Sequence, residues 1–226
     1  MNTGTKTALI AGGIALALLV GAPLIWGAVA RWPDSSWGMM GPGVMGPGMM
    51  GGWRGYSPNA QPLTLEQATE AASHVLNTYG SNLELKEVME FAWNFYAEAE
   101  EKSTGIHTME LLVDKYTGQV SPEMGPNMMW NTKYGMMTQM MGGYNGGGPP
   151  TAEMPITLQQ AKALAQQFLD AKGGGLQVGE PDTFYGYYTL HTLKDGQIEG
   201  MLSVNGYTGL VWYHTWHGTF VRMLER

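Results

Sequence analysis

An internal repeat constrains the fold of this chain more than any other sequence feature. Residues 62–68 read Pro-Leu-Thr-Leu-Glu-Gln-Ala, and residues 155–161 read Pro-Ile-Thr-Leu-Gln-Gln-Ala, 93 positions later. Residues 91–118 align without a gap with residues 182–209, 91 positions later, and both segments end in Tyr-Thr-Gly. Because the matches lie at both ends of the unit, we infer that the chain carries two copies of one small domain.

Each copy begins with a threonine that is followed by apolar residues at helical spacing. Thr64 and Thr157 are typical N-cap residues, and they predict helices that run to about Thr78 and about Ala171. The spacing predicts which side chains each helix buries. These are Leu65, Ala68, Ala72 and Val75 in the first copy, and Leu158, Ala161, Leu164, Ala165 and Phe168 in the second.

Strands are expected after each helix. Trp93, Phe95, Ala97 and Ala99 alternate with polar residues, which is the period of a half-buried strand. Turn residues follow at 103–105 and, in the second copy, as Asp-Gly at 195–196. The sequence therefore predicts the α+β class: two tandem small domains, each with one helix packed on a three- to four-stranded antiparallel sheet.

These patterns divide the chain into five segments. They are an apolar segment (1–31), a Gly/Met/Pro-rich linker (32–60), a first domain (61–124), a Met/Gly-rich linker (125–153), and a second domain with an aromatic C-terminal tail (154–226).

The N-terminal segment predicts attachment to a membrane. Residues 8–30 contain no charged side chain, and about 20 apolar residues suffice for a transmembrane helix. The alternative is a signal peptide that is cleaved after Ala30, because residues 28–30 read Ala-Val-Ala. Both interpretations place the domains outside the cytoplasm, either on a single-pass membrane protein or on a secreted one.

The ending of each repeat resembles the PepSY family. The residues that carry the resemblance are 112–120 and 203–211, each with an Asp or Asn, then Thr-Gly, then a valine. The second copy has Asn205 where PepSY units usually have Asp. The resemblance implies a binding or regulatory module, and the family has no catalytic residues to carry over.

Composition excludes several functions. The chain has no cysteine, which excludes thiolate metal sites and cysteine nucleophiles, and its net charge of -7 gives no footprint for nucleic acid. It contains no common hydrolase or phosphate-binding motif. We therefore expect a non-enzymatic protein without a cofactor, which docks onto another membrane or exported protein as an accessory subunit does.

Methionines offer an alternative function. Twelve of the 18 lie in two stretches, 39–50 and 124–141. Thioether sulfur suits copper(I), so these residues are candidate ligands of an extracytoplasmic copper protein. Methionine is also an adaptable apolar residue that packs or contacts partners. The candidate ligands in the second stretch are Met128, Met129, Met136, Met137, Met140 and Met141.

Histidines and carboxylates complete the candidate set. His214 and His217 are three residues apart and would share a helix face, but two ligands do not close a metal site. The alternative is an aromatic tail that folds back onto the second domain. For His107 and His191 we expect cross-strand pairing. For the acidic residues near residues 98–114 we expect a solvated sheet face.

Overall fold

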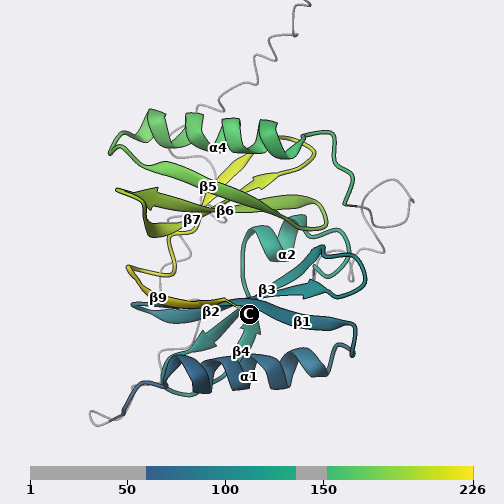
Figure 1. Cartoon of the computed structure of the whole chain (residues 1–226), viewed down its shortest axis with the longest axis vertical. Coiled ribbons are helices and arrows are strands. Elements are labelled where there is room, and N and C mark those ends of the chain that lie inside the picture. The colour runs from purple at the N-terminus through teal and green to yellow at the C-terminus, as the bar shows by residue number, and fades with distance from the viewer. Residues whose placement is uncertain (1–59, 136–151, 226) are drawn as a thin grey trace, which may run out of the picture. The chain divides into compact units, whose positions relative to one another are not determined.

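The expected order of one helix followed by strands occurs twice in the computed structural model, which describes residues 60–135 and 152–225 (Figure 1). The first copy comprises α1 (Leu65–Asn77), β1 (Leu83–Phe91), β2 (Asn94–Glu101), β3 (His107–Asp114) and β4 (Val120–Pro122). The second comprises α4 (Leu158–Lys172), β5 (Gln177–Thr183), β6 (Tyr187–Lys194), β7 (Gln197–Asn205) and β8 (Val211–Tyr213). The short helix α2 (Pro126–Trp130) follows the first copy, and β9 (Phe220–Glu225) ends the chain. The predicted α+β class with antiparallel sheets is confirmed.

Some sequence predictions lie outside the described residues. These are the predicted membrane segment and cleavage site, nearly all of the first linker, and the candidate ligands Met136, Met137, Met140 and Met141. Within residues 60–135 and 152–225, no helix is both long enough and apolar enough to cross a membrane.

Both repeat helices start with the same pair of hydrogen bonds. The Thr64 hydroxyl accepts from the Gln67 amide at 3.2 Å, and the Gln67 side chain accepts from the Thr64 amide at 2.9 Å. Thr157 and Gln160 repeat this capping box at 3.3 and 2.8 Å. The two boxes satisfy amides that no helical carbonyl reaches, so both helix starts were predictable from local sequence.

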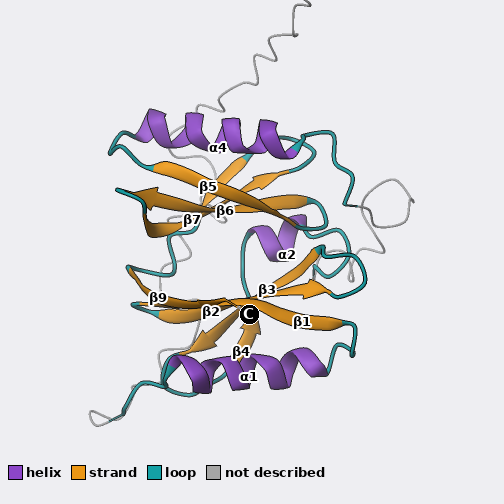
Figure 2. Cartoon of the chain, viewed as in Figure 1, coloured by secondary structure: helices purple, strands orange, loops and turns teal. Residues whose placement is uncertain are grey.

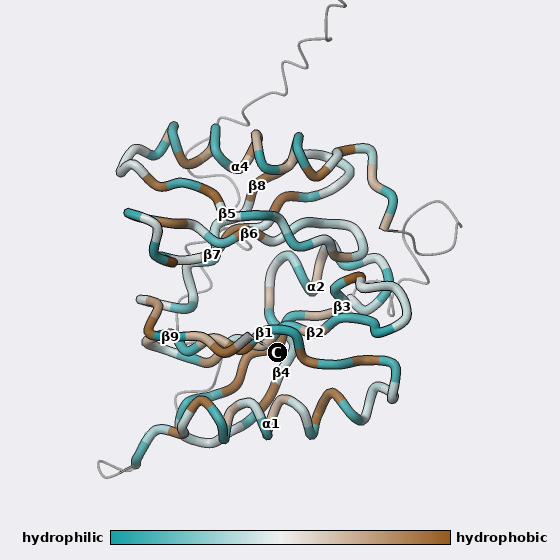
Figure 3. Tube along the Cα trace, viewed as in Figure 1, coloured by the Kyte–Doolittle hydropathy of each residue, from teal (hydrophilic) through white to brown (hydrophobic). Residues whose placement is uncertain are grey.

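The buried stripes differ slightly from the predicted ones. Leu76 and Leu169 are buried although they were not predicted, and Leu158 is 40% exposed although it was. Leu158 is the first residue of α4, and the buried stripe of this helix begins one turn later at Ala161. Figure 3 shows hydrophobic and hydrophilic residues alternating along both helices, as expected of helices with one face on a sheet.

The two sheets are completed by strands that the sequence analysis missed. Their orders are β4-β3-β2-β1-β9 and β5-β6-β7-β8. Strand β1 was not predicted, and β9 leaves the second copy to pair antiparallel with β1, with Val88 opposite Leu224 and Met89 opposite Met223. The tail packs against the second domain at its start, where the His214 amide donates to the Met201 carbonyl at 2.9 Å, but its last strand joins the sheet of the first copy, which the sequence analysis did not predict.

The Thr-Gly ending of each repeat makes one kind of turn. The Asp114 carboxylate accepts from the amides of Tyr116 and Thr117 at 2.9 and 2.8 Å. The Asn205 amide oxygen makes the same two bonds in the second copy, both at 2.9 Å. Asn205 therefore keeps both of these backbone bonds, because they need only a side-chain oxygen at this position.

Each sheet is covered on two faces. Figure 2 shows α1 against the sheet of the first copy and α4 against the sheet of the second, and an apolar cluster lies under each helix. A third cluster joins the opposite faces of the two sheets and is formed by Met89, Phe91, Tyr96, Leu112, Met201 and Trp216. Polar side chains on these opposite faces are therefore removed from water.

Candidate metal centre

Three acidic residues that were predicted to lie on a solvated face of the first sheet are buried instead. Glu98, Glu101 and Glu110 are 2%, 3% and 0% exposed. Their strands alternate as predicted, but the face that was assigned to water packs against the second copy. A buried carboxylate needs hydrogen-bond donors or cations around it, so the partners of these residues indicate where a candidate site lies.

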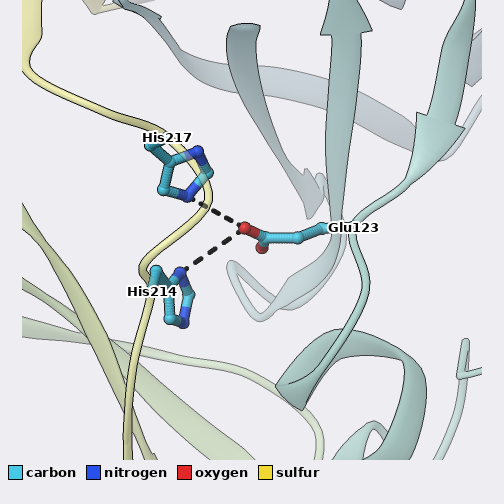
Figure 4. Close-up of side chains that lie close together, drawn as sticks. All are labelled: Glu123, His214 and His217. Carbon is cyan, nitrogen blue, oxygen red and sulfur yellow. Dashed lines mark ion pairs between the residues drawn. The ribbon is translucent and has the colours of Figure 1, made fainter. Parts of the chain in front are cut away.

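Three ligand-type side chains meet in this buried layer (Figure 4). Glu123 directly follows β4, while His214 and His217 lie on the segment that connects β8 to β9. The Glu123 Oε1 atom lies 3.0 Å from His217 Nε2 and 3.4 Å from His214 Nδ1. All three side chains are at most 1% exposed. The two histidines therefore share a site without a helix, because the connecting segment brings both rings to one carboxylate.

Asn94 fixes the tautomer of His217. The Asn94 side-chain nitrogen donates to the Trp216 carbonyl at 2.8 Å, so the Asn94 oxygen must face the ring. That oxygen lies 3.0 Å from His217 Nδ1 and can only accept. His217 Nδ1 therefore carries the hydrogen, and in a neutral ring Nε2 points a lone pair at Glu123.

A chain of hydroxyls fixes the tautomer of His214. Thr189 donates to Glu110 Oε1 at 2.9 Å, so its single hydrogen is used. Ser203 lies 3.0 Å from Thr189 and must donate to it, which leaves the Ser203 oxygen to accept from His214 Nε2 at 2.9 Å. His214 Nδ1 therefore also points a lone pair at Glu123 when the ring is neutral.

With neutral histidine rings, the cluster brings three acceptor groups together: the Glu123 carboxylate and one ring nitrogen each of His214 and His217. Burial raises the pKa of Glu123, but the neighbouring His214 and His217 outweigh it and hold that pKa well below its ordinary value. Burial lowers the pKa of His217 more than Glu123 raises it. Among the described residues, Glu123 Oε2, His214 Nδ1 and His217 Nε2 have no hydrogen-bond partner, because the contacts to Glu123 Oε1 lack hydrogen-bond geometry.

Aromatic rings hold these ligands in place. The Trp216 indole donates to Glu123 Oε1 at 2.7 Å and its ring stacks on His214 with centroids 4.6 Å apart. Phe91 stacks on His217 with centroids 4.5 Å apart. These contacts leave each imidazole little rotational freedom and exclude water from the cluster. The cluster is therefore preorganised, as metal ligands supported by a second shell are.

Glu110 anchors a neighbouring hydrogen-bond network. It lies 2.8 Å from the Tyr187 hydroxyl, 2.9 Å from the Thr189 hydroxyl and 3.0 Å from the Tyr96 hydroxyl. Burial, together with the charges of Glu123 and Glu98, raises the pKa of Glu110 well above its ordinary value. The raised pKa favours the neutral acid form of Glu110, which links the two sheets through these hydroxyls.

A second cluster lies at the edge of the same layer. The His107 ring contacts the Glu98 carboxylate through Nδ1, and its Nε2 atom lies 3.7 Å from Asp182 of the other sheet. Burial and the nearby Glu98 charge raise the pKa of Asp182 to about 7. His191 likewise contacts Glu87 across the sheets at 3.2 Å. His107 and His191 therefore pair with carboxylates on other strands, and each joins the two copies.

Glu101 joins the two copies through hydrogen bonds. Its carboxylate accepts from Tyr185 at 2.8 Å and from the side chains of Lys133, Tyr134 and Thr104. Burial alone would raise its pKa, but these donors lower the pKa to about 2. A lowered pKa means that the charged carboxylate stabilises the fold at pH values above the unfolded-state pKa of about 4.5.

This contribution predicts an acid-sensitive fold. Replacing Glu101→Gln should cost about 1.5–3 kcal/mol at neutral pH, which is typical for hydrogen bonds to a charged group. The difference between variant and wild type should shrink as the pH falls from 4.5 towards 2, because the wild-type carboxylate is then protonated. Urea unfolding at several pH values measures this. Glu84→Gln is the matched control, since Glu84 is exposed on β1. A pH-independent difference would contradict the assignment.

The structure separates the predicted site residues. His214 and His217 are brought together beside Glu123, whereas Met128 and Met129 lie in α2. His74 is exposed on α1. Sequence reasoning missed Glu123 as the third member of this cluster. No signal marked it, because Glu123 is 91 residues from His214 and belongs to no motif.

Comparisons with known proteins give no relative for this chain: no family model, no curated protein and no solved structure matches it.

Proposed function

We propose that the chain is a non-enzymatic extracytoplasmic protein that binds one divalent transition-metal ion between its two repeats, through Glu123, His214 and His217. The observation that supports this most is the convergence of two imidazole lone pairs and a carboxylate, with unpartnered atoms, in a fully buried site. A bound cation would satisfy all three groups at once, and no other described side chain supplies one.

The donor set favours zinc or copper(II) over the copper(I) predicted from methionine. Imidazole nitrogen and carboxylate oxygen are common ligands of zinc and copper(II), while thioethers select copper(I). Glu123 Oε2 is also available, so the three side chains offer four donor atoms. Copper(I) binding by the second methionine-rich stretch stays a prediction, because four of its six candidate ligands lie outside the described residues.

Burial favours a structural role over a catalytic one. A catalytic metal keeps an open coordination position that substrate or water can reach, whereas a structural metal is enclosed by protein. The ligands here are at most 1% exposed and covered by aromatic rings. The metal would join the end of the first sheet to the segment that carries β9. We also propose that the protein docks onto another membrane or exported protein, as its resemblance to PepSY implies.

Direct metal analysis tests the proposed function. The full chain, freed of metal with a chelator and then equilibrated with zinc or copper(II), should retain one buried ion per molecule through gel filtration. His214→Gln and His217→Gln should each lose that ion, because either change leaves an incomplete site. His74→Gln is the matched control, since His74 is an exposed helix residue.

The outcomes separate specific from adventitious binding. Retention of metal in wild type and in His74→Gln, with loss in the two buried variants, supports the centre. Equal retention in all four proteins would refute it, because the metal would then bind elsewhere. Circular dichroism of the metal-free variants checks that each is folded.

A further inference from the structure

The edge cluster offers a second and different set of ligands. Glu98 lies on β2, His107 on β3 and Asp182 on β5, and each provides one ligand-type atom within 4.8 Å of the others. The first two strands belong to one sheet and β5 to the other. None of these residues belongs to the buried centre, so the cluster can be considered on its own contacts.

Charges around this cluster do not balance. Two neighbouring carboxylates have cationic partners: Glu100 pairs with Lys86 at 3.2 Å, and Glu87 lies 3.2 Å from His191. Glu98 and Asp182 share a single His107, which also lies 3.9 Å from Glu100. When both carboxylates are charged, even a protonated His107 leaves this set with one negative charge too many. A divalent cation beside a neutral His107 would make it neutral.

The cluster has a closed inner end and an open outer end. The Glu98 side chain is 3% exposed and accepts from the Tyr96 hydroxyl at 2.9 Å, so its position is fixed. The Asp182 side chain is 38% exposed. A cleft of about 470 Å³ opens at this end and is lined by Gly105, Ile106, His107, Ala152, Pro181 and Asp182, among others. An ion could therefore enter from solvent and keep water ligands.

We propose that Glu98, His107 and Asp182 form a second, solvent-reachable site for a divalent cation. Its donors are two carboxylates and one imidazole, a harder set than the two imidazoles and one carboxylate of the buried centre. Such a set suits manganese(II) as well as zinc, because oxygen donors and water are the ligands that manganese(II) prefers. The two sites share no ligand, so this proposal stands independently of the proposed function.

Manganese(II) is the probe that distinguishes the sites. Titration of the metal-free full chain, followed by the electron paramagnetic resonance signal of free manganese(II), should show one bound ion. Asp182→Asn and His107→Gln should each weaken binding at least about tenfold, the lower end of what loss of even a supporting group costs a metal site. His217→Gln should leave manganese(II) binding unchanged, whatever it does to the buried centre.

Glu180→Gln is the control for general acidity, since Glu180 lies on the same strand with a side chain that is 84% exposed and paired to Lys162. Undiminished binding in Asp182→Asn, or equal weakening in Glu180→Gln, would overturn the proposal, as would no binding by wild type. Loss of manganese(II) in His217→Gln would also overturn it, because the ion would then sit in the buried centre. Thermal melting of each metal-free variant excludes unfolding as the cause.

Discussion

Truncation of Glu110→Ala is expected to destabilise the fold by about 3–5 kcal/mol, the range for breaking a buried polar network by removing one partner. The change would leave the hydroxyls of Tyr187 and Thr189 without their acceptor in a dry interface. It would also create a cavity at a residue that is 0% exposed. Urea unfolding of the full chain measures the loss.

The conservative variant Glu110→Gln should cost about 1 kcal/mol or less. A protonated carboxyl and an amide have the same shape, and each has one donor group (O–H or NH₂) and one carbonyl oxygen that accepts. The Tyr187 hydroxyl can then donate to Asn127 Oδ1, which lies 3.4 Å away. If Glu110 were charged in the native state, the Gln variant would be nearly as damaging as the Ala variant, and the neutral assignment would fail.

The difference in stability between wild type and Glu110→Gln should also depend on pH. The folded-state pKa of Glu110 is raised, so between pH 4.5 and that raised value the native state binds more protons at this residue than the unfolded state does. This residue's contribution to stability therefore falls as the pH rises above about 4.5. Because Glu110→Gln cannot titrate, its stability relative to wild type should improve from pH 5 to pH 8. An unchanged difference over this range would count against a protonated Glu110.

Zinc is expected to raise the free energy of unfolding by about 2.7 kcal/mol when its free concentration is 100 times its dissociation constant. The reason is that Glu123, His214 and His217 form one site only in the folded chain, so the ion binds the native state alone. Thermal or urea unfolding with and without zinc measures the shift.

Variants locate the source of this stabilisation. His217→Gln should remove most of the zinc effect, whereas His74→Gln should keep it. The difference in stability between metal-free wild type and metal-free His217→Gln gives the effect of the mutation without zinc. Equal stabilisation of both variants by zinc would contradict a role for the buried centre.

Local features of the fold were predictable from the sequence. Thr64 and Thr157 predicted both helix starts, since a cap depends on residues three positions away. The Thr-Gly endings predicted both turns for the same reason. The helical stripes were predicted to within one turn, with Leu158 as the clearest error.

Non-local features were not predictable in the same way. Nothing in residues 220–225 indicated that β9 would pair with β1, which lies more than 100 positions earlier. The acidic face of the first sheet has the alternation of a solvated strand, and only its packing against the second copy buries Glu98 and Glu110. The candidate centre combines both difficulties: the histidine pair was visible in the sequence, but only the fold brings Glu123 beside it.

X-ray absorption spectroscopy of the zinc-loaded full chain tests the central claim most directly, because it identifies the atoms bound to the metal. The account predicts nitrogen and oxygen donors at about 2.0–2.2 Å, with the multiple-scattering features of two imidazoles. These features should disappear in His217→Gln together with the bound ion. A spectrum dominated by sulfur scattering would contradict the proposed centre and would assign the metal to methionine side chains, because the chain has no cysteine.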